Sequence, residues 1–354
     1  MNLSNYVCSV PFASLEIHEN NNSLCCGSWL LKELPNKVPL NTLWNSDDAK
    51  EIRKSVSDGS YRHCDKTQCP YLAKLIKLKG VGDFKPIYKK EDLPEQITKN
   101  TNFNTGEMTV GPSIVHMSFD RSCNYKCPSC RLSFIVSGTD KIKEINLTID
   151  EMESTFSNDI SELYITASGD PFASASYRNY LRNFNPSKYP KISKIHLFTN
   201  ASMWNEEMWN SMPNIHKYVE SCEISIDAGT KETYENITRI GGNWENLINN
   251  LKFISTIPKL KFVKTSFVVQ STNYKEMETF LKLMKDIFGK KSQVFFGKIN
   301  NWGTFTEGQY NLLKVWDKSH PEHKNFLNEF EKIYTHPQVF HNLHEFIKTN
   351  RSLV

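Results

Sequence analysis

Short apolar runs rich in β-branched and aromatic residues recur between residues 113 and 299. They are SIVHMSF (113–119), ELYITA (162–167), KIHLFT (194–199), CEISID (222–227), KFVKTSFVVQ (261–270) and QVFFGKI (293–299). Runs of this length and composition are typical of strands with at least one buried face. The pattern therefore predicts six strands in the second third of the chain and beyond.

Segments with helical periodicity lie between these runs. They are YRNYLRNF (177–184), NEEMWNSM (205–212), KETYENI (231–237), NWENLINNLKFIST (243–256) and KEMETFLKLMKDIF (275–288). Strands that alternate with helices indicate an α/β domain with a parallel sheet, either open or part of a barrel. The tail from about residue 306 also reads as helical and lies outside this repeat.

Composition narrows the class of protein. A chain of 354 residues is long enough for two domains, and 39% hydrophobic with 23% charged residues describes an ordinary globular protein. The net charge of +4 is too small to argue for nucleic acid or an anionic membrane as a partner. The N-terminus lacks the basic and apolar regions of a secretory signal, and no apolar stretch is long enough to span a bilayer. We therefore expect a cytoplasmic protein without a membrane partner.

The nine cysteines fall into two groups and one isolated residue. Cys123, Cys127 and Cys130 lie in RSCNYKCPSCR, directly after the first predicted strand. An odd number of thiols cannot pair as disulfides, and a closed structural zinc site takes four ligands. Three thiolates can instead hold an iron–sulfur cluster and leave one iron open. The alternatives are a zinc knuckle that borrows a ligand and three unrelated thiols.

The spacing Cys-x-x-x-Cys-x-x-Cys resembles the radical S-adenosylmethionine (SAM) superfamily over roughly residues 112–305. The resemblance implies a partial (β/α)6 TIM-like barrel whose three cysteines hold a 4Fe–4S cluster, with SAM on the fourth iron. It also implies reductive cleavage of SAM to a 5′-deoxyadenosyl radical, which abstracts hydrogen from a substrate C–H bond. An electron donor such as flavodoxin or ferredoxin would reduce the cluster.

The same resemblance implies SAM contacts at the strand ends. TASGDPF resembles the family's Gly-Gly-Glu motif with Asp in place of Glu, and FTNAS resembles Thr-Asn-Gly. By the period of two along a strand, Ser225 and Asp227 point the same way, and Asp227 could instead cap the next helix. The full expected set is Tyr125, Ser168, Gly169, Asp170, Thr199, Asn200, Ser225, Asp227 and Arg239. Ordinary turns are the alternative for SGDP and TNA.

Two later strand ends carry further polar residues. If the barrel register holds, the upper cavity is lined by Gln270, Asn273, Lys298, Asn300, Asn301 and Trp302. These side chains suit substrate positioning, although Asn at a strand end is also common in turns. Cys222 begins a predicted buried strand and is expected to be an inert small apolar residue.

The N-terminal cysteines resemble those of the SPASM or shorter twitch domains of radical SAM enzymes. Shared features are a Cys-x-x-Pro-Phe start, a hairpin ending in Cys-Cys, a Leu-x-x-x-Trp-Asn helix leading to an Arg, and a closing Cys pair. The resemblance implies a second, auxiliary 4Fe–4S cluster, although these domains usually follow the barrel. Its candidate ligands are Cys8, Cys25, Cys26, Cys64 and Cys69, with one of Cys25 and Cys26 spare. A zinc site with four thiolates is the alternative.

The expected organisation has four parts. They are an auxiliary-cluster domain (1–75), a linker (76–111), the radical SAM core (112–305) and a helical extension (306–354). We expect an oxidation, cross-link or epimerisation on a ribosomal peptide or protein side chain. A carbohydrate or aminocyclitol substrate is the alternative within enzymes, and a non-catalytic metal-cluster sensor is the alternative outside them.

Overall fold

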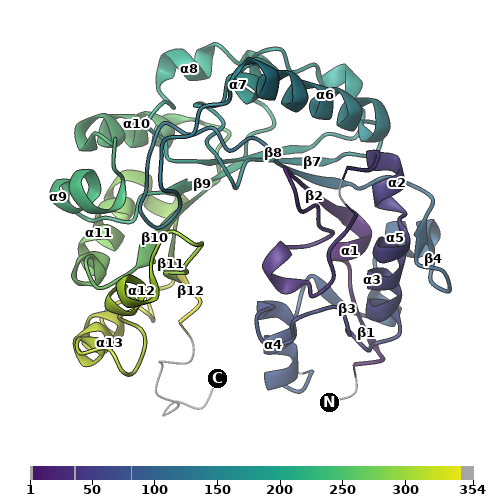
Figure 1. Ribbon diagram of the computed structural model, residues 1–354, viewed down its shortest axis with the longest axis horizontal. Helices are drawn as coiled ribbons and strands as arrows, with labels where there is room; N and C mark the ends of the chain where they lie inside the picture. The colour runs from purple at the N-terminus through teal and green to yellow at the C-terminus, as the bar shows by residue number, and fades with distance from the viewer. Residues whose placement is uncertain (1–2, 36, 81, 344–354) are drawn as a thin grey trace. The chain divides into compact units, whose positions relative to one another are not determined.

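The computed structural model describes residues 3–35, 37–80 and 82–343 (Figure 1). The chain divides into two compact units. Unit 1 comprises Met1–Asp120, Gly138–Ser168 and Asn185–Lys194, and unit 2 comprises Arg121–Ser137, Gly169–Phe184 and Ile195–Val354. The chain passes between the units several times, so neither is one continuous stretch. Residues 344–354 of the expected helical extension lie outside the described residues.

Unit 1 contains three parallel strands in the order β7-β6-β2, and a small antiparallel pair, β1 and β3. Its strands are β1 (Tyr6–Cys8), β2 (Ser14–His18), β3 (Ile87–Lys89), β4 (Thr101–Asn102), β5 (Glu107–Met108), β6 (Ile114–Ser118) and β7 (Glu162–Ile165). Its α-helices are α1 (Val10–Ala13), α2 (Leu40–Trp44), α3 (Asp47–Ser57), α4 (Pro70–Lys77), α5 (Glu95–Asn100) and α6 (Thr139–Phe156).

A buried arginine organises the N-terminal part of unit 1. Arg53 on α3 is fully buried, and its guanidinium lies 4.2 Å from the centre of the Trp44 ring. It donates to the carbonyl of Pro11 at 2.8 Å and to the side chain of Asn45 at 3.3 Å. The Leu-x-x-x-Trp-Asn helix and the Arg of the sequence pattern therefore meet in one packed cluster. A planar, always-charged guanidinium suits such stacking and multiple donation.

Unit 2 contains five parallel strands in the order β12-β11-β10-β9-β8. They are β8 (Lys194–Thr199), β9 (Ser221–Ser225), β10 (Phe262–Val269), β11 (Ser292–Lys298) and β12 (Val339–His341). The α-helices are α7 (Ala175–Arg182), α8 (Glu206–Asn210), α9 (Lys231–Thr233), α10 (Trp244–Thr256), α11 (Met277–Phe288), α12 (Glu307–Leu313) and α13 (His323–Glu331). A π-helical segment, Tyr234–Thr238, continues α9.

One face of the unit 2 strands packs against amphipathic helices. Alternate residues of β8 are buried, as the period of two requires, and α11 buries Met277, Phe280 and Met284 along one side. Figure 1 shows α10 and α11 along the same side of β9–β11. The helices therefore cover one face of the strands and leave the strand ends and the loops after them for chemistry.

The predicted α/β fold is confirmed, and all six predicted strands are present as β6–β11. Two further parallel strands, β2 and β12, join them in their respective units. The sequence predicts only a local hairpin for the segment that contains β2. In the structure this segment forms the hairpin, and β2 also pairs with β6. Glu16 bridges Ser23 in the antiparallel direction and pairs with His116 of β6 in the parallel direction. Helix α6, of 18 residues, was not predicted.

Two smaller expectations also differ from the structure. Strand β9 ends at Ser225, and Asp227 beyond it has φ of 63°, so strand alternation does not extend to Asp227. The expected linker contains β3, which pairs with β1, together with α5, β4 and β5. The four-part division of the chain stays a prediction. Among the described residues, no helix is both long and apolar enough to cross a membrane.

Candidate functional site

The three-cysteine loop follows β6 in the chain and belongs to unit 2. Its backbone is held at two positions, because Cys123 N–H donates to Ile135 O at 2.9 Å and Lys126 N–H donates to Ile240 O at 2.9 Å. Within the loop, Cys130 N–H donates to Cys127 O at 2.9 Å. Cys123 and Cys127 are buried, whereas Cys130 is exposed. The loop thus holds three thiols close together in the chain, with one of the three cysteines exposed.

Each of the three sulfur atoms accepts a hydrogen bond from a different side chain. Arg239 Nη1 donates to Cys127 Sγ at 3.3 Å, and Arg131 Nη2 donates to Cys130 Sγ at 3.4 Å. Asn200 Nδ2 lies 3.7 Å from Cys123 Sγ. Donors of this kind favour the thiolate form and are the contacts that tune sulfur ligands of iron–sulfur clusters. The loop therefore fits a cluster held by three thiolates.

Burial opposes ionisation of the two inner thiols. It raises the pKa of Cys123 to about 11, with a further contribution from the charge of Asp170. It also raises the pKa of Cys127, where the neighbouring guanidinium of Arg239 acts in the opposite direction. Since only thiolates bind metal, metal binding at this loop would release protons.

Arg239 joins the loop to the end of β9. Its Nη2 donates to Asp227 Oδ2 at 2.6 Å and its Nε donates to Ile226 O at 3.1 Å, and both side chains of this ion pair are buried. Burial acts to lower the pKa of Arg239, but Asp227 and Cys127 outweigh it and raise the pKa above its usual value. Asp227 Oδ1 also accepts from Val268 N–H at 2.7 Å. The alternative that Asp227 caps the next helix is wrong, because Thr230 is the N-cap.

Asp170 uses both carboxylate oxygens within unit 2. Oδ1 accepts from the backbone N–H groups of Phe172 and Ala173 at 3.0 and 3.1 Å. Oδ2 accepts from Thr199 Oγ1 and from Asn200 N–H, both at 2.8 Å. Burial raises the pKa of Asp170, and these hydrogen bonds oppose the rise. A carboxylate offers about four lone pairs, so four protein donors already engage it.

The remaining strand-end residues form a connected network. Asn200 Nδ2 donates to Asn124 Oδ1 at 3.0 Å, and Asn124 in turn donates to Ser202 Oγ at 2.8 Å. Ala201 has φ of 61° at the place where the resembled motif has glycine. Tyr125 is buried, with its hydroxyl 3.0 Å from that of Tyr234. Asn200, directly after β8, therefore contacts the cysteine loop, whereas Thr199 at the end of β8 donates to Asp170.

Other predicted residues have different surroundings. Ser168 Oγ donates to Ser118 O at 2.6 Å within unit 1, and Gly169 is half-buried between Ser168 and Asp170. Ser225 Oγ lies 3.4 Å from Ser266 Oγ. Asn301 bonds within its own loop, Trp302 is exposed, and Asn300 is exposed beside them. The Lys298 ammonium lies 5.1 Å from the Trp316 ring centre.

Sequence reasoning missed Arg131 as a donor to sulfur. A basic residue directly after the last cysteine was the available signal. The predicted roles of all these residues toward SAM stay predictions.

The five N-terminal cysteines lie together in unit 1 and none forms a disulfide. Cys8 ends β1, Cys25 and Cys26 follow the Glu16–Ser23 hairpin, and Cys69 precedes α4. Burial raises the pKa of Cys8 and of Cys64 to about 12, and neighbouring thiols of the group add to both rises. Such mutual effects require the side chains to be close.

Both adjacent cysteines belong to this group. Burial and then Cys8 raise the pKa of Cys25, and Cys69 and Cys26 contribute as well. Cys26 Sγ lies 3.2 Å from Ser28 Oγ and is half-buried. Several thiols gathered in one group are a donor set that suits a metal cluster. Which of Cys25 and Cys26 would be spare stays open.

In the part of the chain that the structure describes, no three Cys, His, Asp or Glu side chains converge on a point that could hold a single metal ion. A 4Fe–4S cluster differs from a single ion, because each thiolate binds a separate iron. Both cysteine groups therefore stay candidate cluster sites.

Comparisons with known proteins give no family assignment. No protein-family model matches the chain, and no curated protein matches it. Among solved structures, it is similar to Streptococcus suis SuiB bound to the precursor peptide SuiA. That match has a TM-score of 0.45 and 12% identity, covering 86% of this chain and 69% of that one. TYW1 with a lysine–pyruvate adduct bound has a TM-score of 0.37 and 14% identity, covering 69% of this chain and 79% of that one. Both TM-scores are below 0.5, so neither likeness establishes a shared activity.

Proposed function

We propose that this chain is a radical SAM enzyme in which Cys123, Cys127 and Cys130 hold a 4Fe–4S cluster. The observation that carries the proposal is the set of three N–H donors, one to each sulfur, at a loop with the spacing Cys-x-x-x-Cys-x-x-Cys. When bound, the cluster with SAM supplies the one-electron chemistry that activates an unreactive C–H bond.

The chain's own residues hold and shield this loop. Arg239 places a positive charge beside Cys127 and is fixed by Asp227, while Arg131 places one beside Cys130. Donors to cluster sulfurs raise the reduction potential, so both arginines would make the cluster easier to reduce. The buried side chains of Tyr125 and Tyr234 meet through their hydroxyls and would help to keep water from a cluster bound at the loop.

The finer parts of the proposal concern the substrate and the second cluster. We propose a peptide or protein side chain as the substrate, and a second 4Fe–4S cluster held by the N-terminal cysteines. The clustered, mutually interacting thiols of unit 1 support the second cluster. The outcome would be an oxidation, cross-link or epimerisation in the cytoplasm, with flavodoxin or ferredoxin as electron donor.

Metal content and SAM cleavage test the proposal. Protein purified without oxygen should contain about eight irons per chain, since each cysteine group would hold one four-iron cluster. Cys123→Ala with Cys127→Ala and Cys130→Ala should lose about half of this iron and all cleavage of SAM to 5′-deoxyadenosine under a strong reductant. Iron analysis and chromatography of the products measure both.

Cys222→Ala is the matched control, because Cys222 is a buried thiol of β9 outside both groups. It should keep the iron and the SAM cleavage. Stoichiometric zinc without iron would contradict the proposal. A full complement of iron without any 5′-deoxyadenosine would favour the non-catalytic sensor.

A further inference from the structure

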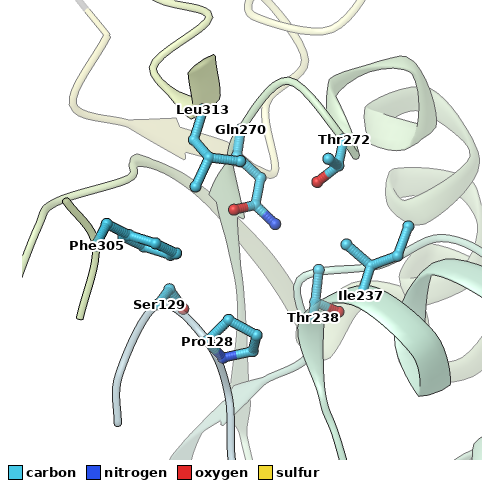
Figure 2. A pocket seen from close by; sticks show the side chains of 8 residues that line it. All are labelled: Pro128, Ser129, Ile237, Thr238, Gln270, Thr272, Phe305 and Leu313. Carbon is cyan, nitrogen blue, oxygen red and sulfur yellow. The ribbon is translucent and has the colours of Figure 1, made fainter. Parts of the chain in front are cut away.

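Unit 2 contains a pocket beside the cysteine loop (Figure 2). It contains about 340 Å³ of space that no atom occupies, and this volume includes space open to solvent. Its walls come from the cysteine loop, the π-helical segment, the turn after β10 and the segment around α12. The lining residues are Pro128, Ser129, Ile237, Thr238, Gln270, Thr272, Phe305 and Leu313.

Gln270 stands out among the lining residues. It is only 7% exposed, and its side-chain amide has no hydrogen-bond partner among the residues that the structure describes. Figure 2 shows the amide directed into the pocket, opposite Ser129 and Thr238. The amide is not among the fully buried polar atoms without a partner, so it faces the open space of the pocket. A ligand that displaces water from this amide must supply the hydrogen bonds in its place.

Hydrogen bonds hold the backbone of Gln270 in place. Gln270 N–H donates to Asn273 Oδ1 at 2.9 Å, and Gln270 O accepts from the N–H groups of Asn273 and Tyr274, both at 3.1 Å. Asn273 Nδ2 donates to Asp227 O and Val268 O at 2.9 Å each. The backbone of the turn after β10 is therefore fixed at Gln270, at the edge of the pocket.

The chemistry of the lining selects a class of ligand. None of the eight residues is charged, so a charged group would be desolvated there without a counter-charge. Gln270 offers a carbonyl acceptor beside an N–H donor in one plane, the pattern that pairs with another amide or with adenine. Phe305, Leu313 and Ile237 supply apolar contact around that plane.

We propose that this pocket binds an uncharged planar group that presents a hydrogen-bond donor beside an acceptor, and that Gln270 recognises it. The group has two possible sources, an amide of a peptide substrate and the base of an adenine nucleoside. The proposal rests on the pocket alone and needs neither iron nor catalytic activity. Failure of the iron test would therefore leave it standing.

Equilibrium dialysis of the full-length protein against adenosine, and separately against N-acetylasparagine amide, tests the proposal. At least one probe should bind, and Gln270→Leu should weaken that probe about tenfold, because one to two hydrogen bonds are lost. Gln270→Glu should weaken it similarly, since a carboxylate keeps the size but offers no donor. If the affinity for adenosine depends on Gln270, the pocket binds a nucleoside. If the affinity for N-acetylasparagine amide depends on Gln270, the pocket binds an amide of a peptide substrate.

The matched control is Gln96→Leu, the same substitution at an exposed position on α5 in unit 1. It should leave both affinities unchanged. Phe305→Ala should weaken binding of the probe while every polar group of the pocket stays. Comparison with Gln270→Leu therefore separates the contribution of apolar contact from that of hydrogen bonding. Thermal unfolding confirms that each variant is folded. The proposal is wrong if wild-type protein binds neither probe, or if folded Gln270→Leu binds both as wild type does.

Discussion

At the scale of single residues, Asp170 shows both the reach and the limit of sequence reasoning. The sequence predicts it at the end of the second strand, and Asp170 does lie in the turn after β7. Its number of protein donors was not predictable, because two of them come from a strand end 29 and 30 residues away. A carboxylate so engaged has a structural role whether or not it also meets a cofactor.

Asp170→Asn should therefore destabilise the fold. An amide cannot accept at both ends, so its NH2 group must face either two backbone N–H groups or Asn200 N–H and the Thr199 hydroxyl. We expect a loss of about 3 kcal/mol in the free energy of unfolding, measured by urea titration. The exposed Asp286→Asn on α11 is the control and should change stability little. Unchanged stability together with weaker SAM binding would instead assign the carboxylate to the cofactor.

At the scale of elements, strands with a clear apolar pattern were predictable and their partners were not. Each of β6–β11 is present where the sequence indicated it. β2 was hidden because ASLEIH reads as one arm of a local hairpin, and nothing local reveals its parallel pairing with β6, about 100 residues later. The predicted end of β9 lies too late in the chain. Ile226 and Asp227 continue the apolar–polar alternation of the sequence, but the strand ends at Ser225 and Asp227 has a positive φ.

The departure at Asp227 creates an ion pair that links β9 to the cysteine loop. Removing one partner of a buried pair leaves the other charge uncompensated. Arg239→Gln and Asp227→Asn should each cost about 3–4 kcal/mol in the free energy of unfolding, and the double variant clearly less than their sum. A double-mutant cycle by urea unfolding measures this coupling. Strict additivity would show that the contact between Arg239 and Asp227 contributes no stability.

At the scale of the whole molecule, each compact unit carries one cysteine group. Cys8, Cys25, Cys26, Cys64 and Cys69 lie in unit 1, whereas Cys123, Cys127 and Cys130 lie in unit 2. The sequence separated the two groups by spacing alone. It did not show that the chain crosses repeatedly between units, because compactness depends on contacts between distant segments. If both groups hold clusters, the two units should respond to metal loss independently.

Cys64→Ser with Cys69→Ser should remove about half of the iron, because the unit 1 group loses two candidate ligands while the unit 2 loop keeps all three. Unit 1 should become more sensitive to protease, since a metal-bound segment with few long helices depends on its metal. Reductive cleavage of SAM should survive, as the loop with Cys123, Cys127 and Cys130 is untouched.

Modification of the true substrate should be lost in the same variant if the unit 1 cluster accepts or relays an electron. Iron analysis, limited proteolysis and product analysis measure the three effects separately, with Cys222→Ala as the control that keeps all of them. A variant that retains the full iron content would place the second cluster elsewhere. A variant that loses half the iron yet modifies substrate at the wild-type rate would leave the N-terminal cluster a purely structural role, because electron transfer through it would then be unnecessary.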